Sequence, residues 1–125
     1  MVAQAQHNSF DPRHQRRIEM MQNLFAYSFY DPNHQQEFQK AHPELNQLLS
    51  QLTELDGTIQ QFAAERPLSQ INKVDLAILR SIMFEWKTSQ TPKKVLIDEA
   101  VELAKEFGTE SSPRFVNGVL AQLLI

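Results

Sequence analysis

The stretch from residue 74 to residue 86 is the feature of this sequence that most constrains its fold. It reads Val-Asp-Leu-Ala-Ile-Leu-Arg-Ser-Ile-Met-Phe-Glu-Trp, and nine of its thirteen residues are apolar. On a helix with 3.6 residues per turn these side chains point in every direction, which is typical of a helix surrounded by other helices. We therefore expect a central helix with only a narrow edge facing water or a partner. The polar residues of that edge are Asp75, Arg80, Ser81 and Glu85.

Capping signals predict where this helix and its neighbours begin. Asn72 is a favourable N-cap, and Asp75 stands where a carboxylate can accept from the Asn72 backbone N–H. Asp11-Pro12, Thr91-Pro92 and Ser112-Pro113 each pair an N-cap residue with a proline at the first helical position.

The spacing of apolar residues predicts four further amphipathic helices. They cover residues 12 to about 30, 44 to about 64, 93–107 and 113–124. Gly57 lowers our expectation that the second of these is continuous, since glycine costs about 1 kcal/mol relative to alanine inside a helix. Residues 31–43, bounded by proline breaks, form a short helix or a loop. No segment alternates with period two for long enough to be a strand, so the sequence predicts an all-α irregular bundle.

Length and composition indicate one small domain. The 125 residues contain 42% hydrophobic residues and no long apolar run, which argues against a membrane span. Residues 1–10 hold little apolar surface, so we expect a flexible arm followed by a single domain over 11–125. The absence of cysteine excludes disulfides, and we see no secretion signal at the N-terminus; we expect a cytoplasmic protein.

The sequence offers no sign of catalysis. It contains no glycine-rich phosphate loop, no Gly-x-Ser-x-Gly elbow and no His-Glu-x-x-His motif. The spacing of its histidines does not put two of them on one helical turn, so we expect neither a metal site nor a cofactor. Glu99 and Glu102 resemble an acid/base pair, but they share a helix face with Lys105 and Glu106, which favours an ordinary solvated surface. We expect a binding protein and not an enzyme. The histidines are His7, His14, His34 and His42.

Two groups of residues have the chemistry to bind an anion. Arg13, Arg16 and Arg17 lie at i, i+3 and i+4, so they share one helix face and can reach neighbouring phosphates, although a solvated polar helix end explains them equally well. The second group is Gly108–Phe115, where hydroxyls and Arg114 surround a helix N-terminus. Phe115 is either a stacking ring or a core residue, and its place in the apolar series favours the core.

Two long motifs closely resemble the NusB transcription antitermination family. The first is Lys94-Val-Leu-Ile-Asp-Glu-Ala-Val-Glu-Leu-Ala-Lys-Glu-Phe-Gly108, followed by Ser112-Pro-Arg-Phe-Val-Asn-Gly-Val-Leu120. The second is Val74-Asp-Leu-Ala-Ile-Leu-Arg80 with Phe84-Glu85, and the first helix is similar more loosely through Arg16-Arg17 and Gln22-Asn-Leu-Phe25. The chain departs from the family pattern at Phe25, Asp98 and Ser111, and its middle region is shorter.

The resemblance implies two packed helical sub-bundles and a role in transcribing ribosomal RNA operons. Such proteins bind boxA RNA together with NusE, a small-subunit ribosomal protein, within the RNA polymerase antitermination complex. Carried over by position, the RNA-binding residues would be Arg13, Arg16, Arg17, Ser111, Arg114 and Phe115. Phe25 and Asp75 would bind NusE, while Asn117 and Gly118 would serve close helix packing.

Three alternatives follow from this resemblance. The first is the antitermination factor, and the second is a diverged module for protein interaction or oligomerisation with weak or no RNA binding, which the net charge of −3 favours. The third is the NusB-like domain of a ribosomal RNA cytosine methyltransferase, which we disfavour because no sequence follows Ile125. RNA preference and homodimer formation stay open.

Overall fold

The computed structural model describes residues 11–63 and 65–124, which form helices and short connections and contain no strand. The predicted arm of residues 1–10 lies outside these described residues. The all-α prediction is confirmed. In chain order the helices are α2 (Pro12–Tyr27), α3 (Pro32–Ala41), η1 (Pro43–Leu45), α4 (Asn46–Ser50), α5 (Leu52–Phe62), η2 (Leu68–Gln70), α6 (Lys73–Thr88), α7 (Lys93–Phe107) and α8 (Ser112–Leu123).

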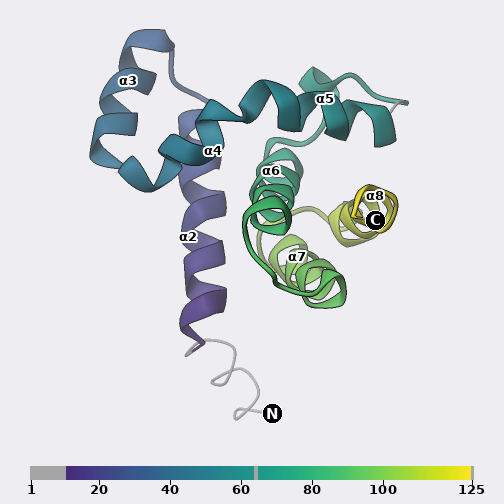
Figure 1. The fold of residues 1–125 in the computed structure, drawn as a ribbon. Helices are drawn as coiled ribbons and strands as arrows, with labels where there is room; N and C mark the ends of the chain where they lie inside the picture. The colour runs from purple at the N-terminus through teal and green to yellow at the C-terminus, as the bar shows by residue number, and fades with distance from the viewer. Residues whose placement is uncertain (1–10, 64, 125) are drawn as a thin grey trace.

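Helix α6 is the centre of the molecule, as predicted. It packs against α2, α5, α7 and α8, and Figure 1 shows α2 standing on one side of it while α7 and α8 lie on the other. Helices α2, α3, η1 and α4 form one sub-bundle, and α5 to α8 form the second. The contact between α2 and α6 joins the two, and the buried hydrophobic side chains of both form one core cluster.

The start of α6 is capped by Asn72, but its polar edge differs from the prediction. The Asn72 side chain accepts from the backbone N–H groups of Val74 and Asp75, at 2.8 and 3.2 Å. Asp75 and Ser81 are buried, at 4% and 7% exposure, so the expectation that they face water is wrong. Ser81 tolerates burial because its hydroxyl donates to the Ile78 carbonyl within the helix.

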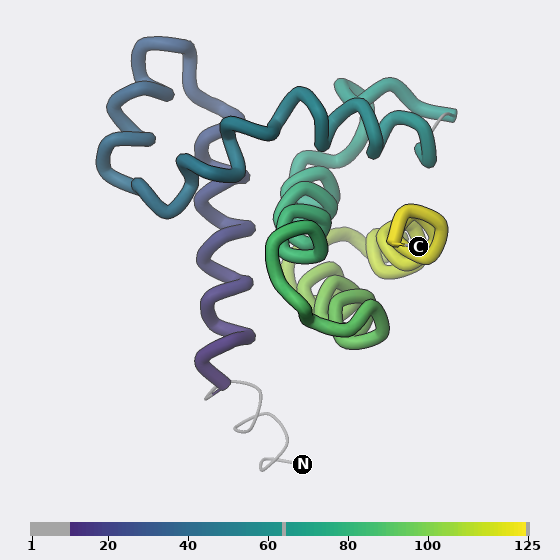
Figure 2. Tube along the Cα trace, viewed as in Figure 1, coloured from purple at the N-terminus to yellow at the C-terminus, as the bar shows by residue number. Residues whose placement is uncertain are grey.

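The predicted helix over residues 44–64 is divided into η1, α4 and α5. The backbone leaves helical geometry at Gln51 (φ −108°, ψ 8°), and Figure 2 shows the chain bending between α4 and α5. The bend lets apolar residues on both sides reach the core, since Leu48 and Leu55 are both fully buried. Gly57, by contrast, lies inside a continuous α5.

The caps of the last two helices are shifted by one residue from the prediction. Pro92 is the N-cap of α7, and the Thr91 hydroxyl donates to Glu85 Oε2. Ser111 is the N-cap of α8, and the Ser112 hydroxyl accepts from the Thr109 backbone N–H at 2.9 Å. Both hydroxyl groups have partners outside the helix start that was predicted for them, and the sequence pattern does not reveal those partners.

Two glycines have opposite surroundings. A Cβ at Gly108 would lie 2.5 Å from Cβ and Oγ of Ser112 and 2.8 Å from the Ala104 carbonyl oxygen, so the turn from α7 to α8 requires glycine. A Cβ at Gly118 would meet nothing within 4 Å. The expectation that Asn117 and Gly118 serve close helix packing is therefore wrong, because both are exposed on α8. None of the described helices is long and apolar enough to cross a membrane.

Candidate functional site

Arg13 and Arg16 lie on the exposed side of the first turns of α2. The Arg13 side chain is 71% exposed, and its Nε lies 3.5 Å from Asp11 Oδ1, too far for a strong ion pair. Arg16 is also exposed. Both guanidinium groups are therefore accessible to an anion from solution.

Arg17 has a different environment from the other two arginines. Its side chain is only 13% exposed, and it donates from Nε and Nη2 to the two carboxylate oxygens of Glu85, at 2.9 and 2.8 Å. Nη1 donates to Glu99 Oε1 at 3.2 Å. This paired geometry is the strongest that arginine makes with a carboxylate. The three arginines thus share a helix face in sequence, but the structure divides them into two exposed cations and one internal ion pair.

His14 joins the same network from its buried position on α2. It is 7% exposed, with Nδ1 2.9 Å from Glu99 Oε1 and Nε2 3.1 Å from Glu106 Oε1. Burial by itself lowers the pKa of His14, but the hydrogen bonds to the two carboxylates outweigh it and raise the pKa above the ordinary value. The spacing of the histidines did not predict these contacts of His14. Its spacing from Ile18 and Met21 places it on the apolar face of α2, which is the signal that would have found it.

The carboxylates of this network come from α6 and α7. Glu99 and Glu106 were expected on a solvated surface; Glu106 is exposed, with 46% of its side chain open to solvent, but the Glu99 side chain is only 22% exposed, and both also bind side chains of α2. Burial raises the pKa of Glu85, but hydrogen bonds from Arg17 and Thr91 and the charge of Arg16 reverse the effect and lower it. The network thus fastens the start of α2 to both neighbouring helices.

The turn between α7 and α8 carries the second candidate group. Ser111 and Arg114 are exposed, and both border a hollow together with Thr109 and Glu110. Phe115 is half-buried against the core, and the Arg66 guanidinium lies over its ring, 4.4 Å from the centroid. Phe115 is therefore both a core residue and one side of a cation–π pair. Arg66 was not predicted, because the pair joins residues far apart in sequence.

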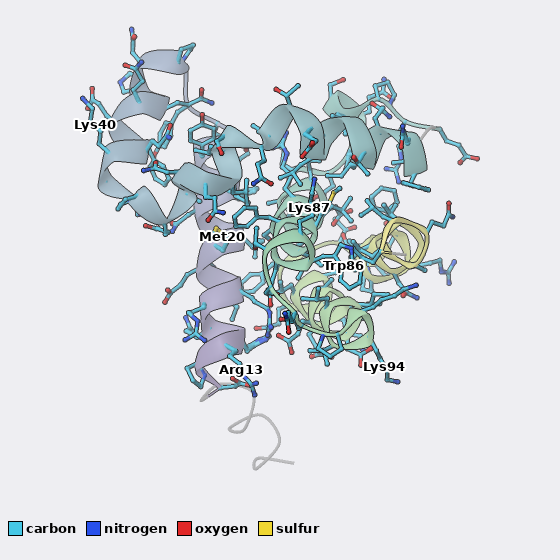
Figure 3. All side chains as sticks on the ribbon, in the orientation of Figure 1. Arg13, Met20, Lys40, Trp86, Lys87 and Lys94 are labelled. Carbon is cyan, nitrogen blue, oxygen red and sulfur yellow. The ribbon has the colours of Figure 1, made fainter. Side chains whose placement is uncertain are left out.

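The network connects the two candidate anion-binding groups, the arginines of α2 and the turn between α7 and α8. His14 contacts Glu106, which stands two residues before Gly108 and the turn that carries Ser111. The lysines at the start of α7 do not extend this surface. Lys93 Nζ lies 3.5 Å from the Ala121 carbonyl, at the opposite end of α8 from Ser111, and Figure 3 shows Lys94 well separated from Arg13.

Phe25 and Asp75, the expected partner-binding residues, lie in different environments. Phe25 is half-buried, and its ring packs edge-on against Phe29 at a centroid distance of 4.8 Å. Phe29 lies beyond the end of α2, which stops at Tyr27 and not near Tyr30 as predicted; its side chain is 58% exposed. Lys73 lies over the Phe29 ring at 5.3 Å.

Asp75 is a buried acid with incomplete hydrogen bonding. Its Oδ1 has no hydrogen-bond partner in the part of the chain that the structure describes. Burial raises the pKa of Asp75, and the Ser112 hydroxyl and the charge of Arg66 only partly oppose this. Such an unsatisfied buried acceptor is costly and rare in native proteins.

Comparison with known proteins gives a consistent result. The model of the NusB family matches residues 2–124. Transcription antitermination protein NusB of Campylobacter curvus is 47% identical over 70 residues, which cover 56% of this chain and 53% of the relative. The protein of the same name from Roseiflexus castenholzii is 49% identical over 73 residues, covering 56% of this chain and 51% of the relative. In these alignments the chain spans about half the length of the curated relatives it matches.

A solved structure supports the same likeness at the level of the fold. The structure of T. maritima NusB superimposes with a TM-score of 0.73 and 26% sequence identity, covering 91% of each chain. The likeness therefore includes the N-terminal sub-bundle, where the sequence motifs were weakest.

Proposed function

The chain belongs to the NusB family, and we propose that it is a transcription antitermination factor, without enzymatic activity, that binds boxA-type RNA of ribosomal RNA operons together with NusE. The observation that carries the proposal is the pair of exposed arginines, Arg13 and Arg16, on a helix start that is fastened to α6 and α7. Cations held on a rigid element lose little entropy when they meet phosphates.

The proposed RNA surface begins at α2 and continues to the turn before α8. Arg13 and Arg16 contact phosphates directly, and Arg114 and Ser111 contact the same strand where it passes the turn. Arg17 was expected to contact RNA, but its pairing with Glu85 and Glu99 supports a role in holding α2 in place. Phe115 offers a ring to a base only where Arg66 leaves its face open.

The proposed surface for NusE lies at the other end of α2. Phe25 and the exposed Phe29 form an aromatic pair, and large exposed aromatic side chains are enriched at protein interfaces. Asp75 is the second proposed NusE residue, and because it is 4% exposed, docking would have to expose its carboxylate, whose Oδ1 has no partner among the described residues. The two ends of α2 would then serve two different partners.

The proposal is tested by fluorescence anisotropy of a labelled boxA-like RNA titrated with this protein, with and without NusE. We expect binding that tightens when NusE is added and that is lost when the RNA sequence is scrambled. Binding to three phosphates of a single strand predicts a slope of about −2 for log affinity against log salt. Equal affinity for boxA-like and scrambled RNA, with or without NusE, would refute the antitermination role.

A second candidate is supported by a specific observation, the internal pairing of Arg17. One of the three predicted cations is already neutralised by Glu85 and Glu99, which weakens the RNA surface. If the remaining cations are too few to bind RNA, the pair of Phe25 and Phe29 would define a protein-interaction or oligomerisation module with little RNA binding. The anisotropy experiment separates the two, because this module would bind NusE or itself but not RNA.

A further inference from the structure

A hollow of about 340 Å³ lies between α2 and α6, next to the exposed arginines of α2. Its apolar wall comes from Met20, Ile82 and Phe84, of which Ile82 is fully buried. Arg13 and Arg16 stand at its rim. Figure 3 shows Arg13 at the start of α2 and Met20 about two turns further along the same helix. The hollow is therefore apolar inside and positively charged at one end.

Hydroxyl groups line the remainder of the hollow. Ser81, Thr88 and Thr91 all line it; Ser81 is buried and Thr88 is exposed. Each of these hydroxyls already donates to an oxygen of α6: Ser81 to the Ile78 carbonyl, Thr88 to the Phe84 carbonyl and Thr91 to the Glu85 carboxylate. Their donor hydrogens are thus committed, and the oxygens keep lone pairs that can accept a hydrogen bond from a ligand.

The charge of the hollow comes from its rim and not from its wall. Glu85 and Arg17 both line it, but they neutralise each other through two hydrogen bonds. Arg16 and Arg13, whose Nε lies 3.5 Å from Asp11 Oδ1, are the exposed cations of the lining. They lie three positions apart on α2, which makes them neighbours on the helix surface. A ligand that fits this hollow has a flat, mostly apolar part whose edge carries hydrogen-bond donors. This part is joined to a negatively charged chain that reaches the arginines.

We propose that this hollow binds one unpaired nucleobase of the single-stranded RNA whose phosphates contact Arg13 and Arg16. The inference rests on the proposed RNA-binding function and adds a base-binding pocket to it. Phe84 and Met20 contact the base, and its amino or imino groups donate to the Ser81 and Thr88 oxygens. An acidic peptide would also match the arginines, but an aliphatic side chain would leave those hydroxyl oxygens without a donor. RNA therefore fits the hollow better than a protein segment does.

The His14 and Arg17 network supports the proposal because it fixes the position of α2 against α6 and α7. His14 is bound to Glu99 and Glu106, and Arg17 to Glu85, so α2 keeps its distance from α6 without a ligand. A pocket that is already formed in the free protein binds with a smaller entropic cost.

The test fills the hollow and compares RNA with and without a base. Thr88→Trp places a large ring at the edge of the hollow, while Gln90→Trp adds the same ring two residues further on, at an exposed position that does not line it. Each variant is titrated with a labelled single-stranded RNA and with a series of the same RNA in which one nucleotide at a time is abasic. Circular dichroism and a thermal melt establish that both variants are folded.

We expect one abasic position to weaken binding to the unmodified protein by about 5- to 100-fold, the range for loss of one stacked base. Thr88→Trp should bind the intact RNA as weakly as the unmodified protein binds the RNA that is abasic at that position. Its own affinity should not change when the base is removed. Gln90→Trp should behave like the unmodified protein. As a second measurement, 4-thiouridine at the sensitive position should crosslink to the segment containing Phe84 or Met20.

The outcomes separate this inference from the function on which it rests. If the unmodified protein binds no RNA, the proposed function fails. If it binds RNA and Thr88→Trp keeps full affinity and full sensitivity to the abasic position, the function stands and the pocket is wrong. Crosslinks confined to the turn around Phe115 would also contradict the proposed base-binding pocket. If Thr88→Trp weakens binding of an acidic peptide but leaves RNA affinity unchanged, the hollow belongs to a protein partner instead.

Discussion

Arg17 on α2 and Glu85 on α6 are joined by two parallel hydrogen bonds of 2.9 and 2.8 Å, across 68 positions of sequence. Because Glu85 is half-buried, its carboxylate depends on this guanidinium for compensation. The pair joins the two sub-bundles at the place where the exposed arginines begin. The role of Arg17 is therefore to position α2, while Arg16, its neighbour in sequence, faces solvent.

Removing the Arg17 guanidinium should cost stability. Arg17→Met keeps much of the aliphatic chain but leaves Glu85 half-buried without its partner, so we expect a loss of roughly 1 to 3 kcal/mol in the free energy of unfolding. Arg16→Met is the matched control and should change that free energy by less than about 0.5 kcal/mol, as exposed substitutions do. Urea denaturation followed by circular dichroism measures both; equal stabilities would contradict the assignment of Arg17.

The stability of the protein should depend on the protonation of His14. Both ring nitrogens face carboxylate oxygens, so the protonated ring satisfies both contacts and the neutral ring only one. The pKa of His14 is raised above the value of 6.5 expected in the unfolded chain. The stabilisation is therefore complete below pH 6.5 and is lost as the pH rises through the higher pKa of the folded protein.

This pH dependence is measured with His14→Gln. The difference in unfolding free energy between the unmodified protein and the variant should be largest near pH 6 and should shrink toward pH 9. Glu106→Gln removes one of the two carboxylates and should lower the His14 pKa, which NMR titration of the ring protons reports. A His14 pKa below 6.5 in the unmodified protein would contradict the geometry described above.

The two glycines should respond in opposite ways to alanine. Gly108→Ala puts a methyl group 2.5 Å from Ser112, and the resulting overpacking should cost about 1 to 3 kcal/mol. Gly118→Ala meets nothing within 4 Å and lies inside α8, so it should stabilise the protein by about 0.5 to 1 kcal/mol. Thermal melts of both variants test the prediction, which fails if Gly108→Ala melts at or above the temperature of the unmodified protein.

Asp75→Asn should make the protein more stable at neutral pH. Burial raises the pKa of Asp75 above its ordinary value of 3.8, so the charged carboxylate opposes folding at pH 7. The gain should shrink as the pH falls through the raised pKa of the folded protein and should vanish only below 3.8, where the acid is protonated in both the folded and unfolded states. Urea denaturation at pH 7 and pH 4 measures it. If NusE contacts this carboxylate, Asp75→Asn should also bind NusE more weakly. The variant would then be more stable but less active in binding.

Periodicity was sufficient to predict the helical fold, because each helix buries a continuous apolar face. The central position of α6 followed from its apolar residues on all sides, and Lys73–Thr88 contains the predicted stretch. The bend at Gln51 was not predictable in this way. Leu48 and Leu55 fit one helical stripe in sequence, and the chain bends there because the core that receives them is formed by other segments.

The candidate site was less accessible to sequence reasoning, because it depends on pairs between distant residues. The spacing of Arg13, Arg16 and Arg17 indicates a shared face, but Arg17 is distinguished only by Glu85 and Glu99, more than 60 residues away in sequence. The surroundings of Asp75 were not predictable for the same reason, since the groups that act on its carboxyl, Ser112 and Arg66, lie on other segments of the chain. The pattern of α7 alone could not show that Glu99 is partly covered by α2 or that the exposed Glu106 binds His14.

The most direct test of the account compares two single charge reversals in one RNA-binding measurement. Arg16→Glu and Lys40→Glu change the net charge equally, but Lys40 lies on α3, well separated from Arg13 at the start of α2 in Figure 3. With boxA-like RNA we predict that Arg16→Glu weakens binding at least about tenfold and flattens the salt slope by about 0.7, the contribution of one phosphate contact. Lys40→Glu should leave affinity within about twofold, since a charge more than a Debye length from the RNA is largely screened. Equal losses in the two variants would show that only overall charge matters and would contradict an RNA site at the start of α2.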